Sequence, residues 1–383
     1  MPGYTTRLLL PTGVAAVALF TLAGCRAPSQ SADESAAAEP DAIPEGAVGK
    51  PAADRPTDTR DVPDPTIMKH GDTYYVYSTG PGIEIRRSRD LVDWELIGTV
   101  LPDSTPTWAQ QEVPGTQIPW APELAFFNGK YHLYFALSTF GSQRSVLGLL
   151  TNTTLDPADP AYEWVDQGKI LESIPGQSTF NAIDGSVIVD TEGQPWLTWG
   201  SFWGGIKMWK LDAATGRLSQ TDTALHSLAT RKGNDPNTHS GKADYSQSIE
   251  GPYIIRHGDY YYLFVSWDAC CLGAESTYNV RVGRSRSVTG PYLDRDGVDM
   301  LEGGGTLVLA GYDQIAGPGH SSILIDGGPQ GPFYIAHHYV NMKEGPSDPN
   351  EPLAIPRSLH VRPLYWAFGG WPIAGEPVNA ELK

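Results

Sequence analysis

A short phrase recurs five times along the chain and constrains the fold more than any other feature. Each copy has one polar residue, a short apolar run, a turn and then a strand rich in aromatic residues. The polar residues are Asp64, Glu123, Asp184, Glu250 and His320, with successive spacings of 59, 61, 66 and 70 residues. Five near-equal periods predict a repeat architecture.

The segments between these copies indicate β-structure. The chain has 383 residues, of which 40% are hydrophobic and 42 are Gly. Short aromatic and β-branched runs bounded by Gly, Pro, Asn and Asp are typical of strands, and no amphipathic helix longer than a few turns is predicted. A period of about 65 residues suits a four-stranded blade with long loops, so we expect an all-β fold, a five-bladed β-propeller.

In such a ring the repeated polar residues are expected to meet at one mouth of the central channel, all at the same height. Buried like charges repel and lose hydration, so a ring of acids is costly unless it is solvated, paired or used. Two interpretations stay open for these acids. They either pair with Lys and Arg or lie in axial water, or they form a catalytic site.

The N-terminus has the pattern of an export signal. Arg7 precedes an apolar stretch that ends in small residues at Ala23, which is typical of a secretory signal peptide. The sequence LAGC at 22–25 resembles a bacterial lipobox, which implies lipid on Cys25 and contact with a membrane through that anchor only. Residues 26–57 are mostly Ala, Pro, Ser, Asp and Glu and are predicted to be a disordered tether.

The chain therefore divides into three predicted parts. These are a lipoprotein signal peptide over 1–25, the tether over 26–57 and a catalytic propeller domain over 58–383. The predicted product is an exported lipoprotein that faces the cell surface or the periplasm, with free secretion as the alternative. A propeller of this size needs no partner to close, so we expect a monomer.

The other two cysteines, Cys270 and Cys271, are adjacent. Cysteine metal sites usually have two-residue gaps and a second pair, so no zinc site is predicted. In an exported protein an adjacent pair can close a vicinal disulfide beside Glu250 or remain as two buried thiols. The sequence does not choose between these states.

Net charge and aromatic residues point to a neutral sugar as substrate. The formal net charge of −17 opposes binding to nucleic acid or to an anionic polymer. Aromatic faces stack on the apolar C–H patches of sugar rings while the hydroxyls keep their hydrogen bonds. The aromatic residues that flank the repeated phrases are Trp120, Phe140, Trp199, Phe202 and Trp203.

Several phrases occur in an order that resembles a known family. They are DPTI, SRDLVDW, WAPEL, STFG, NAID, GSFWGGIK, SIEGPYI, GRSRSVTGPY and GPGHSS, from about Asp61 to Trp371. Together they resemble glycoside hydrolase family 43, and within it the endo-α-1,5-L-arabinanases. The resemblance implies a five-bladed propeller that cleaves linear arabinan or arabino-oligosaccharides internally. It also implies an inverting mechanism, with acid and base roughly 6.5 to 9.5 Å apart.

The resemblance assigns three carboxylates. Asp64 matches the general base, Glu250 the general acid, and Asp184 the carboxylate that modulates the acid and orients the substrate. Glu250 must keep its proton near neutral pH, which burial and the charge of Asp184 favour. Asp64 must stay ionised, so we expect a wetter, hydrogen-bonded environment around it.

The resemblance also implies sugar contacts and a metal ion. The matching sugar-contact positions are Trp120, Phe140, Gly141, Asn181, Ala182, Ile183, Ser201, Phe202 and Trp203, through backbone groups as well as side chains. His320 matches a histidine that binds one central ion, calcium, with waters completing the shell, and no organic cofactor is implied. Since calcium prefers oxygen ligands, a histidine hydrogen-bonded in axial water is the alternative.

Two positions depart from the family pattern. Glu123 stands where Asp is usual after WAP, and Gly185 replaces the proline common after the third carboxylate, which loosens the turn that aims Asp184. Neither change removes a catalytic group, so activity is still expected.

Two other functions stay open. An exo-acting α-L-arabinofuranosidase or β-xylosidase would share the three carboxylates but have one end of the cleft closed by a loop. A non-catalytic surface glycan-binding lipoprotein has no need for an acid opposite a base, so the intact set of carboxylates favours an enzyme.

Overall fold

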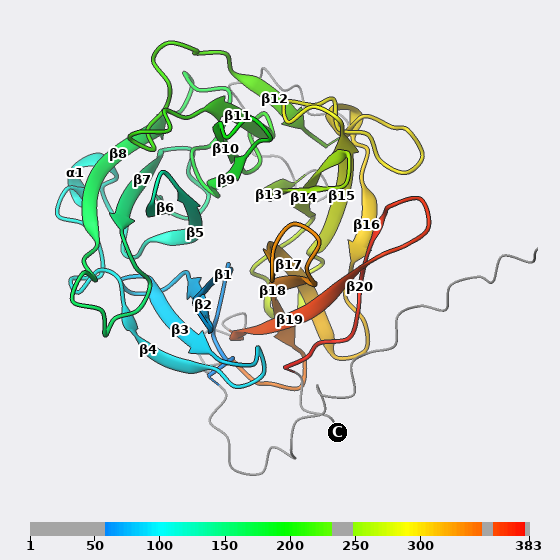
Figure 1. The fold of residues 1–383 in the computed structure, drawn as a ribbon, viewed down its shortest axis with the longest axis horizontal. Helices are drawn as coiled ribbons and strands as arrows, with labels where there is room; N and C mark the ends of the chain where they lie inside the picture. Colours follow the sequence, from blue (N-terminus) through cyan, green and yellow to red (C-terminus); the bar gives the residue numbers. More distant parts are fainter. Residues whose placement is uncertain (1–57, 232–247, 347–354, 380–383) are drawn as a thin grey trace, which may run out of the picture. The chain divides into compact units, whose positions relative to one another are not determined.

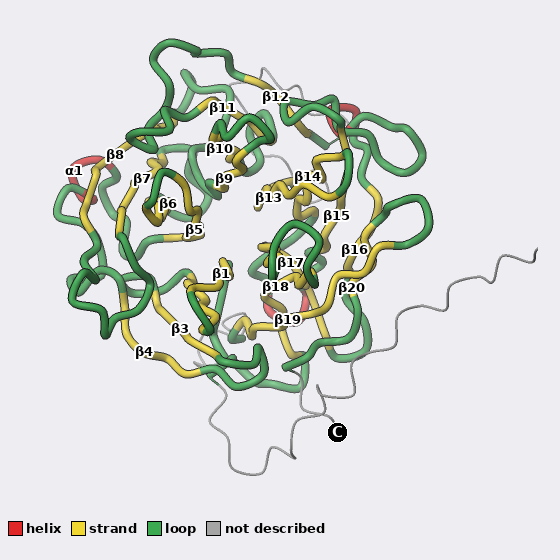
Figure 2. The backbone as a smooth tube through the Cα atoms, viewed as in Figure 1, coloured by secondary structure: helices red, strands yellow, loops and turns green. Residues whose placement is uncertain are grey.

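The structure is a computed structural model that describes residues 58–231, 248–346 and 355–379. The predicted signal peptide, Cys25 and the tether lie outside the described residues. Within these ranges, strands dominate (Figure 2), and helix is limited to α1 (Ala109–Glu112) and the short 3-10 turns η2 (Gly273–Glu275) and η3 (Met300–Glu302). None of these described helices is long and apolar enough to cross a membrane. The all-β prediction is confirmed.

Five four-stranded antiparallel sheets form the blades, and each takes its strands in chain order from the axis outward (Figure 1). Blade 1 contains β1 (Thr66–His70), β2 (Thr73–Ser78), β3 (Glu84–Ser88) and β4 (Glu95–Thr99). Blade 2 contains β5 (Trp120–Phe127), β6 (Lys130–Leu137), β7 (Ser145–Asn152) and β8 (Val165–Ser173). Blade 3 contains β9 (Ser186–Val189), β10 (Pro195–Trp199), β11 (Ile206–Lys210) and β12 (His226–Ala229).

Blade 4 contains β13 (Ile249–His257), β14 (Tyr260–Trp267), β15 (Asn279–Ser285) and β16 (Thr306–Leu309). Blade 5 contains β17 (Ile315–Ile325), β18 (Phe333–Asn341), β19 (Arg357–Trp366) and β20 (Pro372–Ala374). The inner strands contact one another in the ring order β1, β5, β9, β13 and β17, and β17 returns to β1. The predicted five-bladed propeller is therefore confirmed.

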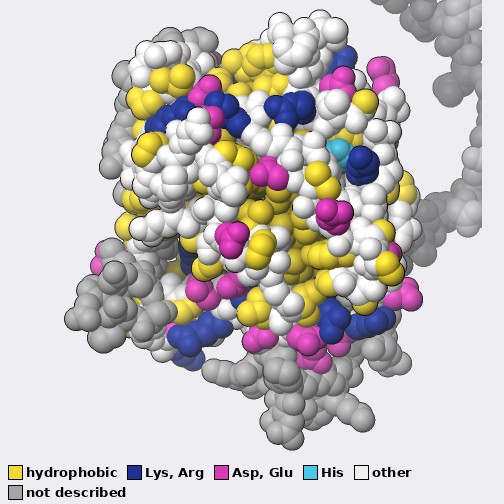
Figure 3. Space-filling view, turned by 90° about the vertical axis from the view of Figure 1, so that its left-hand side faces the viewer, with side chains coloured by type: hydrophobic (Ala, Val, Ile, Leu, Met, Phe, Trp, Pro, Cys, Tyr) yellow, Lys and Arg dark blue, Asp and Glu magenta, His cyan; other side chains and the backbone are white. Residues whose placement is uncertain are grey.

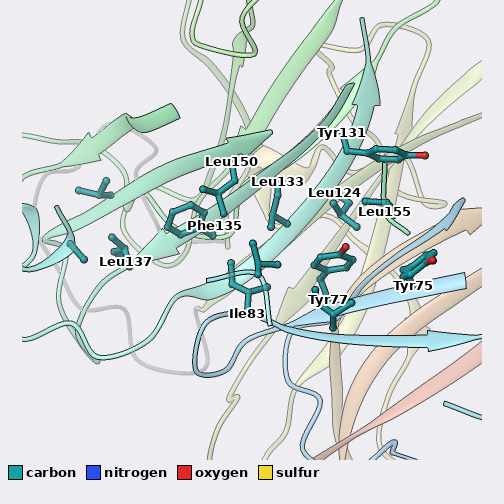
Figure 4. Packing of buried hydrophobic residues seen from close by; sticks show 14 of the residues in the cluster. Tyr75, Tyr77, Ile83, Leu124, Tyr131, Leu133, Phe135, Leu137, Leu150 and Leu155 are labelled. Atoms are coloured by element: carbon teal, nitrogen blue, oxygen red, sulfur yellow. The ribbon is translucent and has the colours of Figure 1, made fainter. Parts of the chain in front are cut away.

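Much of the core lies between neighbouring blades. Tyr77 and Ile83 of blade 1 pack with Leu124 and Phe135 of blade 2 (Figure 4). Burying one large apolar side chain stabilises the fold by roughly 1.5 to 3 kcal/mol. Gly148 in β7 makes room for this packing, since a Cβ there would lie 2.4 Å from the Phe135 ring. The blades therefore hold one another in place around the axis.

The segment at 58–62 closes the ring by bridging the last blade and the first. The Leu359 N–H in β19 donates to the Thr59 carbonyl at 2.7 Å. On the other side, the Asp58 N–H donates to the Trp94 carbonyl of blade 1 at 3.0 Å. Backbone hydrogen bonds from one short segment thus join blades that are far apart in sequence.

The outer surface carries both signs of charge. Figure 3 shows the side on which β4 and β8 lie, and there acidic and basic side chains are interspersed among apolar ones. Mixed charge of this kind, with a net charge of −17, does not make a track for a phosphate backbone. That the chain does not bind nucleic acid stays a prediction.

Candidate active site

The five inner strands share one backbone turn, which precedes β1 and β9 and lies within β5, β13 and β17. The turn residue is Asp64, Ala121, Asp184, Gly251 or His320, and φ lies at 51°, 42°, 58°, 56° and 48° respectively. Each is followed by Pro, Gly or Ser. A left-handed φ is uncommon for residues other than Gly. This turn therefore identifies the equivalent positions in the five blades.

The turn corrects the register expected from the repeated phrase. Asp64, Asp184 and His320 do occupy equivalent positions. Glu250, however, precedes its turn by one residue, and Glu123 follows its turn by two. The expectation that all five polar residues lie at one height is wrong for these two, because backbone conformation sets the register and does not require a polar side chain.

A small cavity lies on the axis just beyond these turns. It is lined by Pro65, Ala121, Pro122, Glu123, Asp184, Gly185, Ser186, Pro252, Tyr253, His320, Ser321 and Ser322. Glu123 is only 5% exposed, and its Oε1 has no hydrogen-bond partner among the described residues. Burial raises the pKa of Glu123 well above its usual range, and a contact with Thr66 acts in the opposite direction. Glu123 thus belongs to the axial cavity.

Asp64 is partly buried among positive and hydrogen-bonding groups. Its Oδ1 lies 3.5 Å from His320 Nδ1 and 3.7 Å from Arg357 Nη1, and its Oδ2 accepts from the Thr79 hydroxyl at 2.6 Å. Burial alone would raise its pKa, but His320, Arg357 and His338 outweigh burial and hold the pKa well below its usual range. Asp64 is thus ionised at neutral pH, as the sequence argument requires of the base.

Two further contacts fix Asp64. Its backbone N–H donates to His338 Nδ1 at 3.1 Å, and burial lowers the pKa of His338 to about 4, so this ring is neutral and can accept. The Thr79 hydroxyl oxygen also accepts from the Ala121 N–H at 2.7 Å. The carboxylate is therefore held between blades 1, 2 and 5.

Asp184 has the opposite surroundings. Its side chain is buried, and its Oδ2 accepts one backbone N–H, from Gly251 at 3.1 Å. Burial, followed by the negative charges of Glu250 and Asp64, raises its pKa well above the usual range, and the Gly251 N–H opposes this only in part. The structure thus raises the pKa of Asp184 through burial and through two neighbouring carboxyl groups.

Glu250 lies between blades 3 and 4 and is partly exposed. Its Oε1 accepts from the Tyr278 hydroxyl at 2.8 Å, and its Oε2 accepts from the Ser201 hydroxyl at 2.6 Å. Burial, together with the charge of Glu250, raises the pKa of Tyr278 well above its usual range, so Tyr278 remains a donor. Two hydroxyl groups therefore orient this carboxyl.

A tight turn places Ser201 beside Glu250. Gly200 has φ 134°, and a Cβ there would lie 2.4 Å from the Gly205 carbonyl oxygen. The Phe202 N–H donates to the Ile249 carbonyl at 3.0 Å, which ties the turn to the start of β13. Only glycine satisfies the close approach at Gly200.

The predicted sugar-contact residues differ in their exposure. Phe140, in the loop after β6, is 74% exposed and is followed by Gly141 with φ 75°. The rings of Phe202 and Trp203 are partly exposed and lie 6.1 Å apart in a tilted arrangement. Trp120 is half-buried and packs against the core between blades 2 and 3. These four aromatic side chains retain surface that a ligand can reach.

Three other predicted sugar-contact residues have side chains that are buried inside the protein. Asn181 is 2% exposed, and its Oδ1 accepts from the hydroxyls of Ser145 and Ser173 at 2.7 and 3.3 Å. Ala182 and Ile183 are also buried. Any contact of these residues with a sugar is therefore through their backbone.

Several site residues were not found from the sequence. Four residues touch one of the predicted catalytic carboxyl groups but do not belong to the repeated phrase: Arg357, His338, Tyr278 and Thr79. Three of them lie at or beside a strand end and His338 lies within β18, positions that many other residues share. The structure also resolves the state of the adjacent cysteines, which form a Cys270–Cys271 disulfide.

No group of three or more His, Cys, Asp or Glu side chains is arranged to hold a metal ion in the described part of the chain. His320 nevertheless lines the axial cavity, and two buried oxygen atoms there, Glu123 Oε1 and Ser321 Oγ, have no hydrogen-bond partner among the described residues. Unpartnered oxygen atoms suit a hard cation that keeps waters in its shell. The residues present therefore fit the predicted ion.

Known proteins resemble this chain over most of its length. The model of the glycosyl hydrolases family 43 matches residues 53–372. An extracellular exo-α-(1→5)-L-arabinofuranosidase of Cellvibrio japonicus (strain Ueda107) is 40% identical over 321 residues, which are 82% of this chain and 87% of the relative. An extracellular endo-α-(1→5)-L-arabinanase of Bacillus subtilis (strain 168) is 37% identical over 315 residues, which are 81% and 86% of the two chains.

Solved structures share the fold. An α-L-arabinanase of Cellvibrio cellulosa complexed with arabinohexaose has a TM-score of 0.74 and 38% identity, covering 82% of this chain and 95% of that chain. An exo-1,5-α-L-arabinanase from a bovine ruminal metagenomic library has a TM-score of 0.71 and 37% identity, covering 84% and 99%.

Proposed function

The chain belongs to the glycosyl hydrolases family 43, and we propose that it hydrolyses α-1,5-L-arabinofuranosidic linkages inside linear arabinan. One observation carries the proposal: at one end of the axis Asp64 has a strongly lowered pKa and Asp184, beside Glu250, a strongly raised one. Carboxyl groups whose environments push their pKa values apart mark acid and base roles. The arabinan-cleaving relatives support the substrate class.

In the proposed reaction each carboxyl group has one role. Ionised Asp64 takes a proton from the attacking water while His320, Arg357 and Thr79 hold it in place. Glu250 donates a proton to the leaving oxygen, oriented by its two hydroxyl donors. The negative charges of Asp184 and Glu250 repel each other when both groups ionise, so the two carboxyl groups together keep one proton to a higher pH than an isolated carboxyl group. Water and acid act on opposite faces of the sugar, which inverts the anomeric centre.

The exposed aromatic rings suit the arabinan backbone. Phe140, Phe202 and Trp203 offer faces on which neutral furanose rings can stack. The net charge of −17 does not penalise an uncharged polymer, whereas it repels anionic ones. Linear arabinan or its oligosaccharides are therefore the proposed partner.

We also propose one cation, calcium by its preference for oxygen, in the axial cavity. His320 would hold it with waters, near the unpartnered oxygens of Glu123 and Ser321. When bound, the ion supplies positive charge that favours ionised carboxylates around the axis. Elemental analysis of the purified chain should find about one ion per chain, lost in His320→Ala. An ion-free protein whose melting temperature a chelator does not change would contradict this.

Export and anchoring at Cys25 remain proposals supported by the signal pattern and by the two extracellular relatives. Cys25→Ala should move the protein from the membrane fraction to the soluble fraction in the cells that make it. Retention of the variant in membranes would contradict lipid attachment. We propose a monomer, and light scattering of the soluble form checks that mass.

A second candidate is exo cleavage from a chain end. It is favoured by the 40% identical relative, which is an exo-arabinofuranosidase. The two modes differ in which products form first, and not in the roles of the three carboxyl groups.

A time course on linear arabinan tests the proposal and separates these modes. The full chain should release a ladder of oligosaccharides, and Glu250→Gln should lower turnover by about a hundred- to ten-thousandfold while arabinan affinity stays nearly unchanged. The exposed Glu275→Gln serves as a control that should behave as the unsubstituted chain. Arabinose alone from the first minutes would establish exo action. Binding without any product would overturn hydrolysis, and a retained anomer would overturn inversion.

A further inference from the structure

The loop between β14 and β15, residues 268–278, is fixed at its ends and touches the proposed acid. The Ala269 carbonyl accepts backbone N–H groups of Thr277 and Tyr278, each at 3.0 Å. The Tyr278 hydroxyl then donates to Glu250 Oε1 at 2.8 Å. The loop is thus tied to the site at one end through a hydrogen bond.

The same loop reaches the proposed base through its disulfide. Arg357 Nη1 lies 3.6 Å from Cys271 Sγ and 4.0 Å from Cys270 Sγ. That nitrogen also lies 3.7 Å from Asp64 Oδ1. The guanidinium therefore sits between the two sulfur atoms and the carboxylate.

Two glycines of strand β17 leave room for the loop 268–278 to pack closely against blade 5. A Cβ on Gly317 would lie 2.5 Å from Ser276 Cβ, and a Cβ on Gly319 would lie 2.1 Å from the Tyr278 ring. Gly317 also has φ 53°, which favours glycine. The close packing of the loop on blade 5 is therefore specified by β17 itself.

The contact between Arg357 and Asp64 does not by itself fix the position of the guanidinium. It joins one guanidinium nitrogen to one oxygen at 3.7 Å and lacks the two parallel hydrogen bonds of a bidentate pair. The Arg357 side chain is about a quarter exposed, so it can occupy other rotamers. The position of the guanidinium then depends on the group that packs against its other side, which is the disulfide.

We propose that the Cys270–Cys271 disulfide is a positioning element of the active site, which holds the Arg357 guanidinium against Asp64. The catalytic meaning of this inference rests on the proposed hydrolysis. Two adjacent cysteines joined by a disulfide cannot rotate their side chains independently. Their sulfur atoms therefore stay in fixed positions against the guanidinium. A dithiol breaks the S–S bond by supplying two electrons and two protons, itself becoming a disulfide, and the two thiols then rotate independently.

A mutant cycle on the full chain tests the proposal. It compares the unsubstituted chain, Cys270→Ala/Cys271→Ala, Arg357→Gln and the combination of all three changes. We expect kcat on arabino-oligosaccharides to fall about threefold in the alanine pair and about tenfold in Arg357→Gln, with KM within about twofold. Because the disulfide acts through the guanidinium, the alanine pair should cost nothing further in the Arg357→Gln background.

Two controls separate positioning from general damage. Arg357→Lys should recover part of the loss, since it restores a positive charge. The exposed Glu275→Gln, in the same loop, should leave kcat unchanged. Independent losses in the cycle, an unaffected alanine pair, or a change in KM with constant kcat would each overturn the proposal.

Two further measurements cover the remaining cases. If the alanine pair does not fold, dithiothreitol treatment replaces it: reduction should lower kcat reversibly in the unsubstituted chain and leave Arg357→Gln unaffected. If the chain hydrolyses nothing, the proposed function fails, and the same cycle read by melting temperature decides this inference. Non-additive melting shifts would support the disulfide–arginine coupling without activity, and additive shifts would overturn it.

Discussion

Asp64 and Asp184 begin the inner strands of blades 1 and 3 with nearly the same backbone conformation, φ 51° and 58°. Asp184 is buried and Asp64 is partly buried, yet the pKa of Asp64 is lowered and that of Asp184 is raised. Around Asp64 lie His320, His338 and Arg357, whereas Asp184 has one backbone N–H and two neighbouring carboxyl groups. The same turn in one ring thus holds one carboxyl group with a lowered pKa and one with a raised pKa, and the neighbouring blades decide which.

The largest expected effect on kcat comes from replacing Asp64, the carboxyl group with the lowered pKa. Asp64→Asn keeps the size of the side chain but cannot take a proton from water, so kcat should fall by about a thousand- to ten-thousandfold. Initial rates on linear arabinan measure this. The exposed Asp72→Asn, in the turn after β1, is the matched control and should keep full activity. A loss of less than tenfold would remove Asp64 from the role of base.

Replacing Asp184 should lower the rate less. Asp184→Asn keeps an acceptor for the Gly251 N–H but no longer repels a negative charge on Glu250, so kcat should fall by about a hundredfold. The basic limb of the pH profile should move to lower pH, because without this repulsion the acid loses its proton at a lower pH. Glu192→Gln, exposed in the turn after β9, is the control. An unmoved basic limb would contradict the coupling.

Stability should change in opposite directions in these two variants. The lowered pKa of Asp64 stabilises the fold above its unfolded value of about 3.9, and this contribution is lost as pH falls through the folded pKa. The raised pKa of Asp184 makes its ionisation costly to the fold, a cost that is absent below about pH 3.9 and grows as pH rises toward the folded pKa.

At pH 8, Asp64→Asn should therefore melt about 2 °C below the unsubstituted chain and Asp184→Asn about 2 °C above it, the size of shift that roughly 1 kcal/mol produces. The difference for Asp184→Asn should shrink toward pH 4, whereas the difference for Asp64→Asn should persist at pH 4 and shrink only below it. Thermal melts at several pH values test this, and shifts of the same sign would break the contrast between the two sites.

The smallest effect is expected at Glu123, a buried carboxyl with a raised pKa that lies outside the ring of turn residues. Glu123→Gln should keep kcat within about twofold and raise the melting temperature at pH 8 by about 1 °C. A tenfold loss of kcat would instead connect the axial cavity to the reaction. A lower melting temperature together with loss of a bound ion would make Glu123 part of the ion site.

The sequence predicted the fold because the repeat is local. Each copy of the phrase marks one blade, and the strand patterns between copies depend on neighbouring residues alone. The sequence also named Asp64, Asp184 and Glu250. It misjudged the height of Glu123 and Glu250 around the axis, because a left-handed turn at Ala121 and Gly251 leaves no polar residue to recognise.

By itself, the sequence determined the number of blades and the acids available at the axis. Only the tertiary structure decided which acid has a lowered pKa and which has a raised one. The physical reason is that a pKa depends on burial and on charges that other blades supply: Arg357 is 293 residues from Asp64 in the chain but 3.7 Å away in the fold. The disulfide that packs on that arginine belongs to blade 4, in the loop between β14 and β15. The order of residues in the chain does not show this contact.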